Sequence, residues 1–253
     1  MIERIDLNAR WGDRQESLDT CANRASVCLR KLAECDAVFG QWYLGGRSRK
    51  EALERRFGPT LEACRTLLDK GRNYRDIPRT LIEELGYMMG LWNGLDGDSA
   101  INVRFQVGAY PAVTAMPTPN ECMIDLPYGG AAADRLLQED KLRLMMRAVI
   151  ESWDPDWARI STFQMHQAVY GEEYRCVSVG WLTYLSDRYG PPPMLPGDYQ
   201  VTRIEGLGSL ITIKGIDRLT ASNPAHVERV RRLLDILRAA DLLSPTPPAS
   251  LTR

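Results

Sequence analysis

The 253-residue sequence contains only two histidines, His166 and His226, and no pair of cysteines separated by two residues. Neither histidine has a partner at a spacing typical of a metal site, and zinc ribbons and C-x-x-C redox motifs are not supported. The sequence also lacks a P-loop, a G-x-G-x-x-G fingerprint and a G-x-S-x-G nucleophile elbow. These absences favour a protein that acts by binding, although they do not exclude an enzyme.

Long apolar runs are absent as well. No stretch reaches the roughly eighteen apolar residues of a membrane span, and the N-terminal MIERIDLNARWGDR carries charges throughout, unlike a signal peptide. Cys21, Cys28 and Cys35 are spaced by seven residues, which predicts a buried stripe on one helix rather than a metal site. We therefore expect a cytoplasmic protein without a metal or other cofactor.

The net charge of −1 is unevenly distributed. Residues 91–198 carry 14 acidic and 8 basic side chains, whereas residues 1–90 carry 14 and 16, and residues 199–253 carry 5 and 8. A basic stripe typical of nucleic-acid binding is missing, so we expect no direct contact with nucleic acid. The acidic middle of the chain would suit a basic partner, and it is equally consistent with a solvated acidic surface.

The order of the predicted elements indicates an α+β fold, with an antiparallel sheet flanked by helices. We expect a single domain over residues 1–243, followed by a disordered tail over 244–253. Within the domain, residues 1–95 are rich in predicted helix, residues 96–215 in predicted strand, and residues 223–243 form a C-terminal helix.

Several stretches give specific expectations. Alternating apolar and polar residues predict a half-buried strand over 99–108, and helical periodicity predicts helices over 78–92 and 131–152. Residues 157–166 are expected to form a strand. Residues 177–186, VSVGWLTYLS, are apolar on both faces, which predicts an interior strand covered on both sides.

Two carboxylates lie close together in SWDPDW, at Asp154 and Asp156. They would suit a cation, but a turn at the end of a helix is the simpler interpretation, because Pro155 cannot extend a helix. With His166, these aspartates form the best candidate set for an unrecognised metal-dependent hydrolase. The strand motif of restriction-type nucleases is not satisfied, because Thr212 stands where its metal-binding acid would be.

Seven segments resemble a known family in order and spacing over nearly the whole chain. They are RWGDRQES, FGQWYLGGRSRKEAL, ELGYMMGLWNG, ESWDPDWARIST, VGWLTYLS, GSLITI and NPAHVERVRRLLDILRAADLL. The resemblance is to the polymorphic-toxin immunity family called immunity protein 52. Members are encoded beside toxins with a restriction-endonuclease-like nuclease domain, often delivered by type VI secretion. The resemblance therefore implies a cytoplasmic antitoxin that binds such a toxin, and it implies no catalytic residues.

The resemblance also suggests two sets of residues. The recurring positions, which we expect to be structural, are Trp11, Arg14, Trp42, Gly180, Trp181 and Tyr184. The acids that we expect to meet the basic cleft of a nuclease are Asp96, Asp98, Asp154, Asp156, Glu172 and Glu173.

Alternatives to direct blocking of the cleft stay open. One alternative is allosteric: the protein would bind the toxin away from the nuclease cleft and disturb the assembly of the toxin. A secretion adaptor or structural partner is a further interpretation, and unpaired sheet edges leave a homodimer open.

Overall fold

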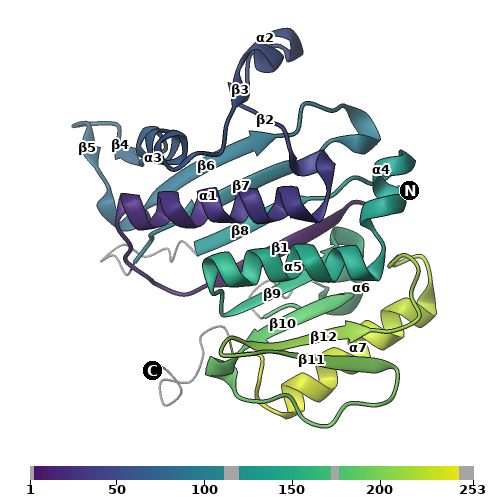
Figure 1. The fold of residues 1–253 in the computed structure, drawn as a ribbon. Coiled ribbons are helices and arrows are strands. Elements are labelled where there is room, and N and C mark those ends of the chain that lie inside the picture. Colours follow the sequence, from purple (N-terminus) through teal and green to yellow (C-terminus); the bar gives the residue numbers. More distant parts are fainter. Residues whose placement is uncertain (1–2, 111–119, 172–176, 245–253) are drawn as a thin grey trace.

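The computed structural model describes residues 3–110, 120–171 and 177–244 (Figure 1). Its strands are β1 (Ile5–Trp11), β2 (Trp42–Tyr43), β3 (Arg56–Phe57), β4 (Tyr74–Arg75), β5 (Thr80–Leu81), β6 (Tyr87–Trp92), β7 (Asn102–Val107), β8 (Asn120–Asp125), β9 (Trp157–Thr162), β10 (Leu182–Ser186), β11 (Tyr199–Ile204) and β12 (Gly208–Ile213). Its α-helices are α1 (Leu18–Cys35), α2 (Arg49–Glu54), α3 (Leu61–Lys70), α4 (Gly130–Leu136), α5 (Glu139–Trp153), α6 (Phe163–Tyr170) and α7 (Pro224–Ala239). Short 3₁₀ turns are η1 (Ala37–Phe39), η2 (Glu83–Leu85), η3 (Gly97–Ser99) and η4 (Asp187–Tyr189).

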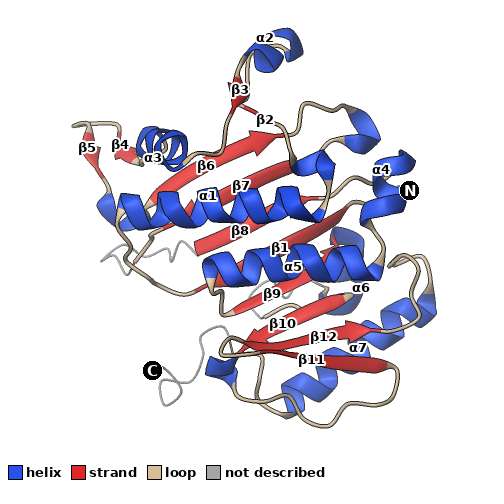
Figure 2. Cartoon of the chain, viewed as in Figure 1, coloured by secondary structure: helices blue, strands red, loops and turns tan. Residues whose placement is uncertain are grey.

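One ten-stranded sheet, in the order β11-β12-β10-β9-β1-β8-β7-β6-β2-β3, connects the described parts of the chain. Every neighbouring pair in it is antiparallel. Strands β4 and β5 form a separate two-stranded ribbon. The predicted α+β class with an antiparallel sheet and flanking helices is confirmed (Figure 2).

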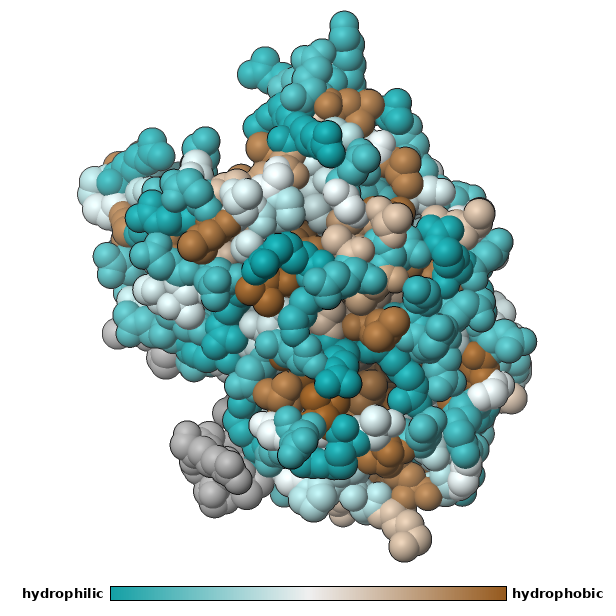
Figure 3. Space-filling model, viewed as in Figure 1, coloured by the Kyte–Doolittle hydropathy of each residue, from teal (hydrophilic) through white to brown (hydrophobic). Residues whose placement is uncertain are grey.

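Helices α1 and α5 lie across one face of the sheet (Figure 1). The α1 stripe is buried as its cysteine spacing predicts: Cys21 and Cys28 are fully buried, and Ser17 caps the helix by accepting the Thr20 backbone N–H. The outer surface on this side is mainly hydrophilic, with scattered apolar residues between polar ones (Figure 3). This side of the sheet is therefore sealed by an ordinary amphipathic layer.

Helix α7 lies on the other face, at the β11 end of the sheet. On β11, Gln200 and Thr202 accept hydrogen bonds from Arg143 of α5, whereas the hydroxyl of Tyr199 donates to the Arg229 carbonyl of α7. Because successive side chains of a strand point to opposite faces, α5 and α7 lie on opposite sides of β11. Helix α6 packs against α7, with Arg231 donating to the Ala168 carbonyl.

The predicted helix over 78–92 is wrong, because its last part is strand β6. Alternate residues of β6 are buried, and the strand pairs with β7 from Tyr87 to Trp92. Gly86 has a φ of +62° and Gly90 lies within the strand, and both residues weaken a helix. Pairing with β7 outweighs the helical spacing of the apolar residues.

Three other predicted elements differ in their bounds. The helix over 131–152 is divided into α4 and α5 at Leu137, and the strand over 157–166 ends at Thr162, whose side chain caps α6 by accepting the Met165 N–H. In 177–186 only Leu182–Ser186 is strand, and it is buried between β9 and β12 as predicted. The predicted tail 244–253 lies outside the described residues, apart from Ser244.

Candidate partner-binding surface

Strands β6, β7, β8, β1 and β9 carry three rows of side chains on the face opposite α1 and α5. Cross-strand pairing puts the members of each row side by side. The rows are Trp92, Asn102, Asp125, Asp6 and Ser161; Gly90, Arg104, Met123, Asn8 and Arg159; and Met88, Gln106, Glu121, Arg10 and Trp157. We call this lattice the uncovered face, with reference to the described residues only.

The charged groups of the uncovered face lie at two depths, with an acid below and arginines above. Glu121 lies on the floor with a side chain only 8% exposed, and it pairs with Arg104 at 2.6 Å and with Arg10 at 3.3 Å. The side chains of Arg104 and Arg10 are 56% and 40% exposed. A single buried carboxylate thus holds two guanidinium groups that point to solvent.

A second ion pair lies nearer α6, where Arg159 contacts Asp6 at 3.1 Å and both side chains are largely buried. Burial and the neighbouring Asp6 raise the pKa of Asp125. Burial, followed by Arg159, lowers the pKa of His166 on α6, and the His166 ring stacks on Tyr170. Desolvation therefore affects the ionisation of groups on this face and on its rim.

Two hollows on the uncovered face share lining residues, and we call the pair the groove. One, of about 330 Å³, extends from Asn8 and Arg10 to Phe163 and His166 on α6. The other, of about 310 Å³, extends across β7 and β6 to Gly45. Arg104 and Met123 line both hollows, so the groove crosses the sheet from α6 to the link between β2 and α2.

Four polar atoms of this face are buried without a hydrogen-bond partner among the described residues: Asp6 Oδ2, Asn8 Oδ1, Arg10 Nε and Ser161 Oγ. Of these, Asp6 Oδ2 still lies 3.1 Å from Arg159 Nη1 in an ion pair. Asn8 is 4% exposed and Ser161 is 1% exposed. Buried polar atoms without partners cost roughly 1–3 kcal/mol each. The uncovered face therefore holds hydrogen-bonding capacity that the described fold does not use.

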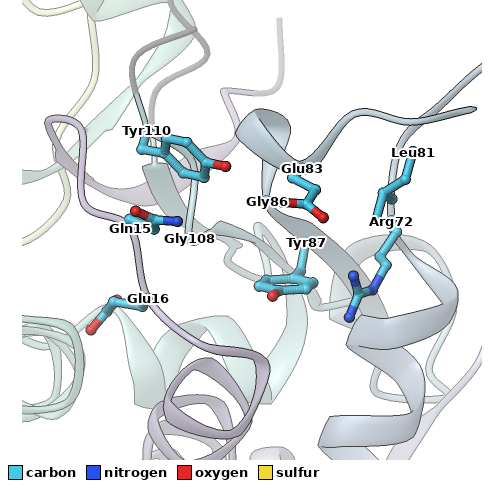
Figure 4. Close-up of a pocket in the computed structure, with 9 residues that line it drawn as sticks. All are labelled: Gln15, Glu16, Arg72, Leu81, Glu83, Gly86, Tyr87, Gly108 and Tyr110. Carbon is cyan, nitrogen blue, oxygen red and sulfur yellow. The ribbon is translucent and has the colours of Figure 1, made fainter.

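A smaller hollow of about 160 Å³ lies at the edge of the sheet, beside the first turn of α1 (Figure 4). Two of its three charged side chains already have partners: Glu16 pairs with Arg24 at 2.8 Å, and Arg72 pairs with Asp69 at 2.7 Å. Arg72 also covers the ring of Tyr87, with its guanidinium carbon 5.2 Å from the ring centre. These pairings leave the small hollow a weaker candidate than the groove.

Asp154 and Asp156 form part of an arginine-clamped turn between α5 and β9. Asp156 accepts the Gly12 N–H at 2.7 Å and Arg188 Nε at 2.7 Å, while Arg188 Nη1 lies 3.2 Å from both carboxylate oxygens of Asp154. Arg188 thus occupies the position between the two carboxylates that a cation would need. The turn that the sequence suggested is present, and Asp154 ends α5 in a left-handed conformation.

Asp96 and Asp98 lie beside η3, between β6 and β7. Asp96 pairs with Arg49 of α2 at 2.5 Å with both side chains exposed, and the Asp98 carbonyl accepts the Tyr128 N–H. Strands β6 and β9 run in the same direction, because four antiparallel steps separate them. Asp96 follows the end of β6 whereas Asp156 precedes the start of β9, so the two aspartate pairs lie at opposite ends of strands about 20 Å long.

Glu172 and Glu173 lie outside the described residues. His166 lines the groove, whereas the carboxylates of Asp154 and Asp156 are held by Arg188. In the parts of the chain that the structure describes, no group of three histidine, cysteine or acidic side chains is arranged to hold a metal ion.

The recurring aromatic and glycine positions lie within the scaffold. Trp11 stacks on Trp153 with ring centres 5.5 Å apart, and Arg14 covers Trp11 while donating to the Trp153 and Asp154 carbonyls. Trp42 is buried beside Phe39. Trp11, Arg14 and Trp42 therefore join the sheet to the helices that cover it.

The remaining signature positions lie around β10. A Cβ added to Gly180 would lie 2.3 Å from the Ile160 carbonyl oxygen, which explains why glycine is needed there. Trp181 is fully buried, and the hydroxyl of Tyr184 donates to the Leu207 carbonyl. Burial raises the pKa of Tyr184.

Sequence reasoning missed most of the uncovered face. Asn102, Arg104 and Gln106 were available as the polar side of the half-buried strand predicted over 99–108. Their partners on β6 were hidden by the incorrect helix prediction, and those on β1 and β8 become neighbours only through pairing across a long stretch of sequence.

The fold and this surface define an α+β protein whose broad antiparallel sheet has one helix-sealed face and one polar, grooved face. The chain belongs to the immunity protein 52 family, whose sequence model matches residues 6–246. Family membership assigns it an immunity role, in which the partner is a cognate toxin. Among the described helices, none is long and apolar enough to cross a membrane.

A solved structure, the Pseudomonas aeruginosa T6SS protein PA0821, has a similar fold, with a TM-score of 0.53 and 12% sequence identity. The match covers 92% of this chain and 76% of that chain. At this identity the similarity shows the fold alone. A comparison with curated proteins finds no match.

Proposed function

We propose that this protein is a cytoplasmic immunity protein that binds a cognate nuclease-type toxin and neutralises it, protecting the producing cell and its kin. The observation that carries the proposal is the family match over residues 6–246. Similarity in fold to a T6SS protein supports a toxin delivered by type VI secretion. In this proposal the toxin carries a restriction-endonuclease-like domain, and neutralisation needs binding but no catalysis.

Within this proposal, the acidic candidates have two different tasks. Asp96 and Asp98 adjoin the uncovered face, where carboxylates would steer a basic nuclease toward the protein and raise the association rate. Asp154 and Asp156 hold Arg188 and Gly12, so they act by fixing the turn that starts β9. Glu172 and Glu173 stay in the set of acids proposed to meet the toxin.

Co-expression with the toxin encoded beside the gene tests the proposed function. Cells that carry the active toxin should grow only with the immunity protein, and cells that carry a catalytically inactive toxin should grow without it. The inactive toxin and the purified protein should elute together in gel filtration. Failure of both rescue and complex formation would contradict the proposal.

Charge reversal tests the steering role of the acids. Asp96→Lys with Asp98→Lys should lower the association rate about 10-fold at low salt and make its salt dependence shallower. Asp235→Lys, an exposed change on α7, is the matched control and should leave the rate within about 2-fold. Equal rates for the three proteins would remove the steering role while leaving the immunity role intact.

A further inference from the structure

We propose that the uncovered face is the surface that receives the toxin, and that it takes an apolar anchor of the toxin flanked by a carboxylate. This inference rests on the proposed function and specifies where and how the partner binds. It is carried by the groove, by the outward arginines and by the unused polar atoms of β1 and β9.

The dimensions of the uncovered face suit the centre of a protein interface. Five strands spaced by about 4.8 Å make the rows about 19 Å wide, and three rows extend over about 14 Å along the strands. A standard interface buries about 800 Å² on each partner, and its energy is concentrated near its centre. The rows supply such a centre, with α6 and the β6–β7 turn as its rim.

The charges of the face favour a carboxylate on the partner. Arg104 and Arg10 share the one carboxylate of Glu121, and each guanidinium has five N–H donors. The two side chains are 40% and 56% exposed, so part of each guanidinium is open to solvent, although Arg10 Nε itself is buried. A partner carboxylate placed between them would form charge-assisted hydrogen bonds, which are about twice as strong as neutral ones.

The unused polar atoms point to a partner that brings its own hydrogen-bonding groups. Asn8 Oδ1 accepts a donor, and Ser161 Oγ takes either a donor or an acceptor. Both side chains are more than nine-tenths buried, and Asn8 lines the groove. A partner donor that reaches the groove would satisfy Asn8 Oδ1, which is otherwise costly to bury, whereas Ser161 lies beneath Gly180 and does not line the groove.

Apolar groups along the same groove define where the anchor lies. Phe163 is 54% exposed on α6 and lines the hollow with Met123 and Trp157, while Met88 is 40% exposed at the end of the third row. Aromatic residues and methionine are enriched in the cores of protein interfaces. An aliphatic or aromatic side chain of the toxin would fill the hollow beside Phe163.

A protein partner fits this face better than a nucleic acid. The three arginines of the rows, Arg10, Arg104 and Arg159, are matched by three acids, Asp6, Glu121 and Asp125. A phosphate backbone needs an excess of positive charge, and it would meet these carboxylates on the floor. The balance of charge favours a partner that presents a single carboxylate.

Two matched pairs of variants test the surface by calorimetric titration with catalytically inactive toxin. Arg104→Glu on the uncovered face is compared with Arg65→Glu on α3, another exposed arginine held by one carboxylate, at 2.7 Å from Asp19. Phe163→Asp is compared with Leu144→Asp, which is 48% exposed on α5. Each uncovered-face variant should bind at least about 10-fold more weakly, and each control should stay within about 2-fold of the wild type.

Circular dichroism and thermal unfolding check that every variant is folded. If Arg104→Glu does not fold, Arg104→Gln replaces it as the milder variant. A toxin variant with one acid changed to lysine should restore binding to Arg104→Glu. If the wild type binds the toxin and both uncovered-face variants bind it with the same affinity, the surface assignment is wrong while the proposed function stands. Absence of wild-type binding and rescue would overturn the proposed function as well. Tight binding of a single-stranded oligonucleotide that Arg104→Glu abolishes would also overturn the assignment.

Discussion

Cys122 and Met123 are neighbours on β8, yet they lie in two different environments. Cys122 is fully buried under α1, in a row with Phe105 and Ala9 that contains only apolar side chains. Met123 faces the groove, in a row with Arg104 and Asn8. One face of the sheet is covered by α1 and α5 and forms the core. On the other face α6 and α7 cover the β11 end, whereas β6, β7, β8 and β1 keep polar groups and open space.

The difference between the two faces separates stability from recognition. On the covered face Trp153 packs against Trp11 and Phe105, with ring centres 5.5 and 5.1 Å apart, and Arg14 caps the end of α5 above them. A well-packed layer of this kind fixes the register of the strands. The side chains of the uncovered face are therefore held in rows without being needed for the core.

The largest expected effect is on the covered face. Trp153→Ala should lower the free energy of unfolding by about 3–5 kcal/mol, because it leaves a cavity beneath α5. Phe163→Ala, on the rim of the uncovered face, should change it by less than about 0.5 kcal/mol. Urea unfolding of both variants measures the contrast, and similar losses at the two positions would show that the faces do not differ in their contribution to stability.

The reactivity of thiols at positions 122 and 123 gives a second comparison of the two faces. Burial raises the pKa of Cys122 well above its ordinary value and that of Cys21 to about 12, so neither should react in the native protein. Cys176 lies outside the described residues, so it is first replaced by serine. In that background a Met123→Cys thiol should react with an alkylating reagent at least about 100-fold faster than Cys122. Intact-mass spectrometry followed by peptide mapping measures both rates, and equal rates would contradict the two-face description.

Bound toxin should sharpen this contrast. Under the proposed binding mode the toxin covers residue 123, so complex formation should slow labelling of Met123→Cys by about 10-fold or more. A cysteine introduced at Leu144 on α5 is the control, because that exposed position lies on the helix-covered side. Equal slowing at the two positions would indicate a different docking site.

The arginine-clamped turn at the end of the rows should have a smaller effect on stability. Arg188→Met removes donors from Asp154 and Asp156 and leaves the mostly buried Asp156 carboxylate with only the Gly12 N–H, so it should cost about 2 kcal/mol. Arg65→Met breaks the exposed pair with Asp19 and should leave the free energy of unfolding nearly unchanged. Thermal unfolding compares them, and equal small losses would remove the structural role proposed for the two aspartates.

The covered face was easier to predict from the sequence than the uncovered one. The cysteine spacing of α1 and the apolar character of β10 report burial directly, because each follows the period of its own element. The break at Leu137 and the start of α6 at Thr162 depend on local capping, which periodicity does not contain. Strand β6 was mistaken for a helix because pairing with β7 decides its conformation.

The candidate site depends even more on long-range pairing. Glu121 follows Arg104 by 17 residues, and Arg10 lies far earlier in the chain. The pairing of β1, β7 and β8 brings the three side chains together. Of the acidic residues that drew attention in the sequence, the four that the structure describes lie at opposite ends of the sheet, and two of them hold Arg188. The charge of the sequence therefore showed only that the middle of the chain is acidic. The position of the uncovered face follows from the pairing of strands.

The smallest expected effect concerns the pH dependence of the uncovered face. Burial and the nearby Arg159 lower the pKa of His166, so folding favours its neutral form. The stability that this contributes is fully present above the unfolded pKa of about 6.5, and it is lost as the pH falls through the lower folded pKa. Urea unfolding between about pH 8 and pH 5.5 should therefore show a loss that is smaller in His166→Gln, with a difference below the 1.4 kcal/mol per pH unit of one full proton. Parallel pH profiles for the two proteins would show that the environment of His166 is not desolvated.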